Sequence, residues 1–169
     1  MGMKLELLED LLFLKMAKLR SAEQQQSGLF PKLLRSAQAP ELKQALERHQ
    51  QETERQLNRL QELLQGREQG SGGDSQGIRG IIADCEDLLG MEMDPEIRDA
   101  AIISSVAAAE NFEIGCYADV FLLAQQIGNR PVADALECSL REEKAMADKL
   151  AALSQALTPE AVAMEQGGR

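Results

Sequence analysis

Apolar residues recur at intervals of three and four positions along most of the chain, which is the periodicity of amphipathic helices. Four long stretches with this pattern are predicted as helices, at residues 3–27, 40–65, 95–127 and 131–157. Two shorter stretches, residues 31–36 and 78–89, predict additional short helices. Alanine, leucine, glutamate and glutamine dominate the composition, and β-branched runs are few, so the chain is predicted to be all-α.

The connections between the helices predict the topology. Short connections join helices one and two, and helices three and four, so each pair should form an antiparallel hairpin. Between helices two and three lie a Gly- and Ser-rich loop at residues 66–77, expected to be flexible, and the short helix at 78–89. We therefore expect a ferritin-like four-helix bundle over residues 1–157, with a long crossover carrying a fifth short helix. The tail, residues 158–169, is expected to be frayed.

Each of the four apolar stripes is interrupted near its middle by a carboxylate, and one also by the only histidine. These residues are Glu23, His49, Glu52, Glu110, Glu113 and Glu143. An isolated buried carboxylate is costly, and several in one interior would also repel one another. A pair of divalent metal ions removes both costs. The sequence therefore predicts a dinuclear metal site inside the bundle, with these six residues as ligands.

The ligand types narrow the choice of metal. His49 and Glu52, and likewise Glu110 and Glu113, are three residues apart and so share a helix face. Five carboxylates and one imidazole favour two iron or manganese ions, because structural zinc sites prefer thiolates and more imidazoles. The five negative charges nearly balance the four positive charges of two divalent ions.

Several neighbours could support these ligands. Gln26 and Gln56 lie one turn from Glu23 and Glu52 and are expected to orient them by hydrogen bonds. Tyr117, one turn beyond Glu113, is either such a support or a core residue. The charged side chains of Arg59 and Glu142 are expected to lie in solvent.

A simpler interpretation exists for each residue taken alone. A single glutamate in an apolar stripe often lies at its edge and extends its carboxylate to water. A single histidine is more often a core or surface residue than a ligand. The recurrence of a carboxylate at matching depth in all four helices favours the metal site.

Charge and composition exclude other functions. The chain has 169 residues and a formal net charge of -10, which argues against a nucleic-acid surface. No apolar run approaches the length needed to span a bilayer. The three cysteines form no CxxC pair and are expected to be reduced thiols, and no signal-peptide pattern is present, so we expect a cytoplasmic protein.

The chain resembles the YciE/YciF group of bacterial ferritin-like stress proteins from Leu7 to Leu153. The matching stretches are LRSAEQQ, PELKQALERHQQETERQ, DPEIRDAAIISSVAAAENFEIGCY and LREEKAMADKL. The resemblance implies that the acid of SAE, HxxE, ExxE and an acid of EEK line a di-metal centre. These map onto the six residues named above. It also implies a dimeric, cytoplasmic protein linked to stress responses, without an established reaction.

The ligand order departs from that of many ferritin-like proteins, which carry ExxH on two helices. Here the second helix has HxxE and the third has ExxE. Met146 stands three residues after Glu143, where a histidine is expected.

Three functions remain open from the sequence. The site could react with a small oxidant such as O2 or peroxide, giving oxidase or peroxidase-like activity, or it could bind metal without turnover. Alternatively, the bundle is a dimeric interaction or structural module whose acids hold a structural ion or none. A wide apolar band on the first helix predicts a homodimer; it consists of Leu5, Leu8, Leu11, Leu12 and Phe13.

Overall fold

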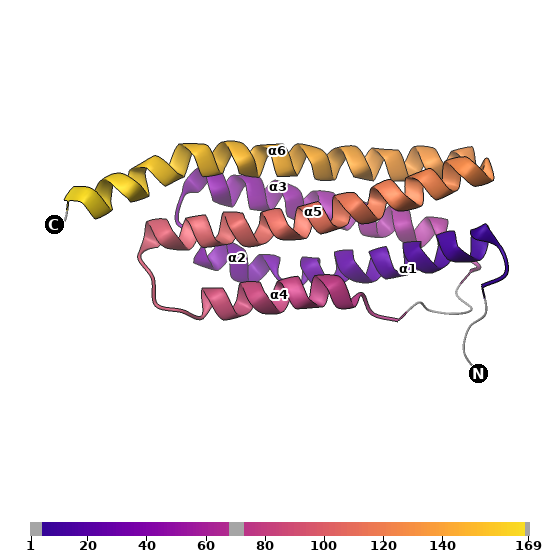
Figure 1. Cartoon of the computed structure of the whole chain (residues 1–169), viewed down its shortest axis with the longest axis horizontal. Coiled ribbons are helices and arrows are strands. Elements are labelled where there is room, and N and C mark those ends of the chain that lie inside the picture. Colours follow the sequence, from indigo (N-terminus) through magenta and orange to yellow (C-terminus); the bar gives the residue numbers. More distant parts are fainter. Residues whose placement is uncertain (1–4, 68–72, 168–169) are drawn as a thin grey trace.

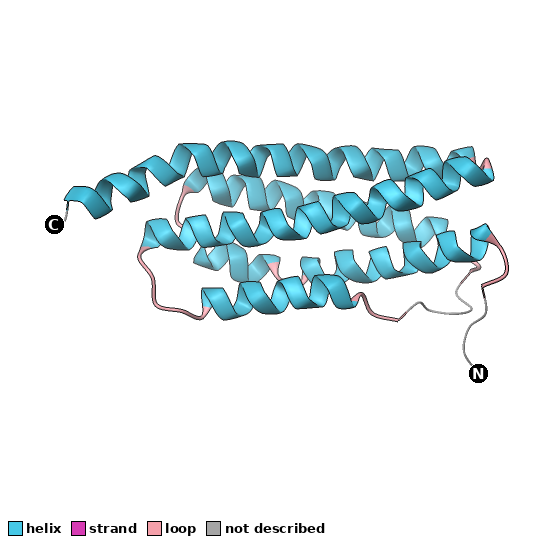
Figure 2. Ribbon diagram, viewed as in Figure 1, coloured by secondary structure: helices cyan, strands magenta, loops and turns pink. Residues whose placement is uncertain are grey.

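The computed structural model describes residues 5–67 and 73–167, with the side chains described through residue 157. All regular structure in these residues is helical (Figure 2). The six helices are α1 (Leu8–Ser27), α2 (Phe30–Ser36), α3 (Pro40–Leu63), α4 (Gln76–Leu89), α5 (Pro95–Ile127) and α6 (Arg130–Gly167). The all-α prediction is confirmed. No described helix is both long enough and apolar enough to cross a membrane.

The four long helices, α1, α3, α5 and α6, lie side by side as a bundle (Figure 1). The short helix α2 turns the chain from α1 into α3, and a tight connection at Gly128 turns α5 into α6. Gly128 has a φ of 79°, a left-handed conformation that glycine adopts without strain. Helix α4 packs along α1 and α5 and carries the crossover, as predicted for a ferritin-like fold. Much of the loop predicted at residues 66–77 falls on residues 68–72, which lie outside the described part.

Two helix ends differ from the prediction. Helix α1 begins at Leu8 rather than near residue 3, because the Asp10 carboxylate accepts hydrogen bonds from the backbone N–H groups of Glu6 and Leu7, both at 2.9 Å. These bonds cap the first turn. Helix α6 continues to Gly167 instead of ending near Leu157. Pro159 removes only one backbone donor, and the residues that follow it are mostly strong helix formers.

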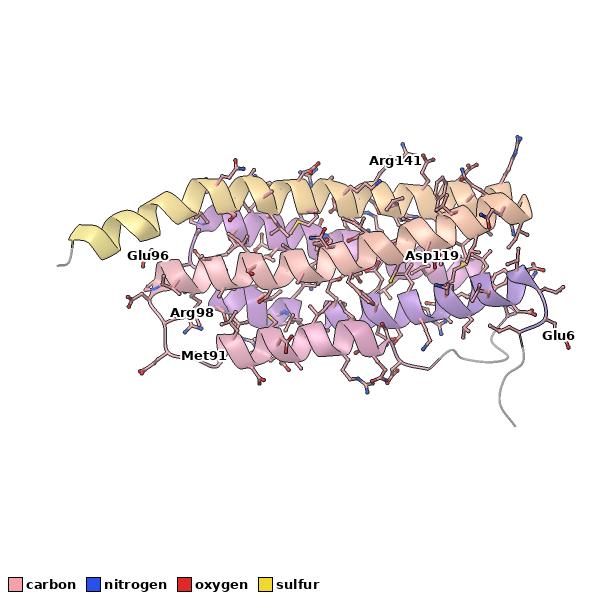
Figure 3. The ribbon with its side chains drawn as sticks, viewed as in Figure 1. Glu6, Met91, Glu96, Arg98, Asp119 and Arg141 are labelled. Atoms are coloured by element: carbon pink, nitrogen blue, oxygen red, sulfur yellow. The ribbon has the colours of Figure 1, made fainter. Side chains whose placement is uncertain are left out.

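The interior has two large apolar clusters and a small third one, formed by Ala22, Ile78 and Ala109. The first, around Phe30, Leu46 and Ile102, lies where α2 packs on α3 and α5. The second lies toward the α5–α6 turn and includes Leu12 and Leu136. Charged side chains such as those of Glu6 and Arg141 project outward from the bundle (Figure 3).

Between the two clusters, all four long helices contribute buried polar side chains, which we call the polar layer. No member is more than 2% exposed. The polar layer consists of Glu23, Gln26, His49, Thr53, Gln56, Glu110, Glu113, Tyr117, Ser139 and Glu143.

Candidate metal centre

Five of the six predicted ligands lie in the polar layer. Helix α1 supplies Glu23, α3 supplies His49, α5 supplies Glu110 and Glu113, and α6 supplies Glu143, and each is 0% exposed. Each replaces an apolar residue within the stripe of its helix, so the packing that buries the stripe also buries the polar group.

Three of these residues form a compact group. His49, Glu110 and Glu143 each offer one ligand atom, and these atoms lie within 4.8 Å of one another. Nitrogen and oxygen ligands bind divalent metal ions at about 2.1 Å, so two ligands on opposite sides of one ion are roughly 4 Å apart. One ion could therefore reach all three with small movements. Phe30 packs edge-on against the His49 ring, with the ring centroids 5.6 Å apart, and limits its rotation.

Glu110 contacts polar side chains of both α1 and α3. Its Oε1 lies 2.9 Å from His49 Nε2 and accepts a hydrogen bond of 2.8 Å from Gln26 Nε2. The prediction that Gln26 orients Glu23 by a hydrogen bond is therefore wrong. Glu23 is instead bonded to Tyr117 Oη, which donates to Glu23 Oε1 at 2.5 Å, and Gln26 is left facing α5.

Glu143 is held from α3. Gln56 donates to Glu143 Oε1 and to Glu142 Oε2, although the sequence analysis had assigned Gln56 to Glu52. Arg59 pairs with Glu142 at 3.1 Å, and both side chains are only 22% exposed, so their assignment to solvent was also wrong. They lie at the α3–α6 contact, where packing covers them.

Two members of the polar layer, Thr53 and Ser139, were missed as candidate functional residues. Arg59 donates to Ser139 Oγ at 2.5 Å, and Ser139 in turn hydrogen-bonds the Tyr117 hydroxyl. Thr53 is buried four residues after His49, with its hydroxyl unpaired. The signal was present in the sequence, because Thr53 and Ser139 interrupt apolar stripes as the acids do.

Glu52 is the one predicted ligand outside the polar layer. Its side chain is 19% exposed; Oε2 lies 3.6 Å from His49 Nδ1, and Oε1 faces Arg48 and Arg55 at 3.7 and 3.9 Å. The His49 ring beside it, together with the charges of the two arginines, lowers the pKa of Glu52 in spite of partial burial. Glu52 is therefore an anion at the edge of the polar layer.

Without a metal, Glu23, Glu113 and Glu143 favour the neutral form. Burial raises the pKa of Glu113 and Glu143 well above the usual range, and the neighbouring carboxylates raise it further. Burial also raises the pKa of Glu23 to about 8, although the Tyr117 hydrogen bond opposes the shift. Burial alone would lower the pKa of His49, but Glu110 and the other acids outweigh it and raise the value to about 9.

The donor set fits a cation. Ten buried side-chain nitrogen and oxygen atoms lack a hydrogen-bond partner within the described residues, and all belong to the polar layer. They include both oxygens of Glu113 and one oxygen each of Glu23, Glu110 and Glu143. Both ring nitrogens of His49 also lack a well-directed hydrogen bond, although Nε2 lies 2.9 Å from Glu110 Oε1. Buried polar atoms normally have partners, so a cluster of free lone pairs marks a place where a cation can bind.

The comparisons agree with this fold. The chain is 29% identical to Protein YciF of Escherichia coli K12 over 154 residues, which covers 90% of this chain and 93% of that protein. The crystal structure of the E. coli stress protein YciF matches with a TM-score of 0.86 and 28% identity, over 92% of this chain and 99% of YciF.

Two further solved structures are similar. YcfI of Rhodopseudomonas palustris, for which a structural role has been suggested, matches with a TM-score of 0.83 and 31% identity, over 89% of this chain and 96% of YcfI. A Xanthomonas campestris protein matches with a TM-score of 0.71 and 20% identity, over 95% and 99% of the two chains, and supports the fold alone. The family described as "Domain of unknown function (DUF892)" matches residues 7–163. The chain therefore belongs to the DUF892 family and is a homologue of YciF.

Proposed function

We propose that this protein binds two iron or manganese ions in the polar layer and uses them in redox chemistry with a small oxidant such as O2 or peroxide. The observation that carries the proposal is the buried group of His49, Glu110 and Glu143, surrounded by polar atoms without partners. A layer that served only to pack the bundle would not need ten unpaired buried nitrogen and oxygen atoms.

The residues divide between two positions. His49, Glu110 and Glu143 would hold one ion, and Glu23 and Glu113 would hold the second. The four interior carboxylates match the four positive charges of two divalent ions, so the loaded centre is close to neutral. The acids must lose their protons as the ions bind, so metal binding should release protons.

A bound iron or manganese pair supplies electrons to an oxidant through a change of oxidation state. The role of the chain is to hold ligands and protons in place while the charge changes. Gln26 and Gln56 donate to Glu110 and Glu143 and fix their carboxylate planes. Tyr117 donates to Glu23 Oε1 and so orients this carboxylate. The apolar clusters on both sides exclude bulk water.

Metal analysis after growth without chelators tests the first step. We expect up to two iron or manganese ions per chain, and a loss of at least one in Glu110→Gln. Glu54→Gln is the matched control, because Glu54 lies on the exposed face of α3. The loaded protein should then consume O2 or peroxide with a change in its metal absorbance. Wild-type protein that binds neither metal would disprove the proposal.

A second function, a dimeric structural module, is supported by apolar residues on the surface. Leu5, Leu7 and Leu8 before and at the start of α1 are 41%, 64% and 55% exposed, and Leu122 on α5 is 53% exposed. The band proposed from the sequence is narrower than expected, because Leu12 is fully buried in the core. The structural role suggested for YcfI agrees with this alternative.

Light scattering, combined with metal analysis, tests whether dimer formation and metal binding are separate properties. A homodimer should dissociate, or weaken, when Leu7 and Leu8 are both changed to Glu, while metal content stays unchanged.

We infer a cytoplasmic location, since three free thiols are typical of a reducing compartment.

A further inference from the structure

A surface groove lies over one side of the polar layer, between α3 and α6, which pack together (Figure 1). Its volume is about 620 Å³. Its lining includes Glu47, Arg48 and Glu52 from α3, and Ala145, Met146 and Lys149 from α6. Glu52 and Met146 each lie one helical turn from a member of the compact group, His49 and Glu143 respectively. Through Glu52, which lines the groove and lies 3.6 Å from His49 Nδ1, the groove therefore adjoins the candidate centre.

Glu52 faces both the groove and the buried His49. It lines the groove, yet its Oε2 lies 3.6 Å from Nδ1 of the buried His49, a nitrogen without a hydrogen-bond partner. The two arginines that face its other oxygen are 82% and 55% exposed. Ion pairs with such exposed partners are weak, so a divalent cation in the groove can displace them.

We propose that this groove is the route by which a hydrated divalent cation reaches the centre, and that Glu52 is the carboxylate that binds the ion first. From there the ion exchanges its water ligands for His49, Glu110 and Glu143, and Glu52 returns to its arginines. The step is ligand exchange alone. This inference rests on the proposed metal-binding function, and it gives Glu52 a role in uptake that fits its partly exposed place at the edge of the polar layer.

A second groove, between α1 and α5, is less suited to a cation. It has a volume of about 310 Å³ and is lined by Lys15 and Lys18, together with apolar residues such as Phe112. The carboxylate in its lining is that of Asp119, which is paired with Lys15 at 2.5 Å. Of the two grooves, only the one between α3 and α6 offers a carboxylate that also contacts a buried candidate ligand.

Uptake kinetics test the route on the full chain. Metal-free protein is mixed rapidly with Co²⁺ as a spectroscopic probe, and both the rate of absorbance change and the equilibrium affinity are measured. Ala145→Phe narrows the groove without changing a polar group, and Ala152→Phe on the exposed face of α6 is its control. Glu52→Gln removes the receiving charge, and Glu54→Gln is the control for that loss.

We expect Ala145→Phe to slow uptake while the equilibrium affinity stays unchanged. Glu52→Gln should slow uptake on the order of tenfold, the lower end of electrostatic effects on association rates. Both controls should match wild type, and circular dichroism should show that all four variants are folded.

Three results would overturn the inference. Wild-type uptake rates in Ala145→Phe would exclude the groove as the route. A loss of affinity in Glu52→Gln at an unchanged uptake rate would make Glu52 an ordinary ligand. Wild-type protein that binds no Co²⁺, Mn²⁺ or Fe²⁺ would instead remove the proposed function, and the inference with it.

Discussion

The apolar cluster around Leu46 and the polar layer next to it occupy the same four-helix interior, but they satisfy different requirements. Leu46, Phe30 and Ile102 are 0% exposed and belong to one apolar cluster, whose Phe30 also packs against the His49 ring. Farther along α5 from Ile102, Glu110 and Glu113 are equally buried but leave oxygens without partners. The first region stabilises the fold by itself. The second is stable in its charged form only if something else enters it, which is why it is the candidate site.

The largest expected effect separates the two regions directly. Leu46→Ala leaves a cavity in the apolar cluster and should lower the free energy of unfolding by about 2–5 kcal/mol. Because Leu46 belongs to the apolar cluster and carries no ligand atom, we expect the same loss with metal bound and with metal removed. Urea unfolding measures both values. Leu122→Ala, at a position 53% exposed, is the control and should change stability by only about 0.5 kcal/mol or less.

The second effect belongs to the polar layer alone. Chelation should destabilise the wild-type protein, because metal at 100 times its dissociation constant stabilises the folded state by about 2.7 kcal/mol per independent site. The melting temperature should therefore fall on chelation and recover on addition of iron or manganese. In Glu110→Gln this response should shrink, whereas Leu46→Ala should retain it. An equal response in wild type and Glu110→Gln would show that the stabilising ion binds elsewhere.

The pH dependence of the metal-free protein should reveal the same contrast. The pKa of Glu23 rises from 4.5 to about 8, so above pH 4.5 the unfolded chain ionises this group before the folded chain does, and stability falls. The pKa of His49 rises from 6.5 to about 9; its contribution is full below pH 6.5 and is lost as pH rises to about 9. Both contributions decline together between pH 6.5 and 8.

Urea titrations of metal-free protein between pH 5 and 9 measure this decline. Burial and neighbouring acids raise the pKa of Glu113 in the same direction, so Glu113→Gln should flatten the curve. Leu46→Ala should lower the whole curve without changing its slope. A metal-free protein whose stability rises with pH across this range would contradict the assigned protonation states.

The contrast between the apolar cluster and the polar layer also explains which features could be predicted from the sequence. Stripe periodicity and turn residues were enough for the bundle and the crossover, because burial of a stripe requires no detailed geometry. The four interior acids and His49 were found because they interrupt that periodicity. Their partners were not found correctly. Gln26 contacts Glu110 rather than Glu23, and this depends on the rotation of α1 against α5, which a one-dimensional pattern does not contain.

Exposure at the edge of the layer was equally hard to predict. Glu52 shares a face with His49 at a spacing of three, yet it is 19% exposed because it faces the groove between α3 and α6. Arg59 and Glu142 were assigned to solvent, but the contact between the same two helices covers them. Such differences arise from how far two helices stand apart locally, which side-chain volumes on both helices determine together.

The smallest expected effect tests whether Tyr117 belongs to the core or to the centre. Tyr117→Phe removes the bond to Glu23 Oε1 and keeps the apolar ring in place. In the metal-free protein at pH 7, Glu23 is mostly neutral because its pKa is about 8, so the loss should be that of a neutral hydrogen bond, about 1 kcal/mol. With metal bound, Glu23 is ionised, and hydrogen bonds to charged groups contribute more, about 1.5–3 kcal/mol. Stability and metal affinity measured on the same samples should therefore show a larger loss in the loaded protein. An identical loss in both states would place Tyr117 with the core around Leu12 and Leu136, and would leave Glu23 without a partner in the centre.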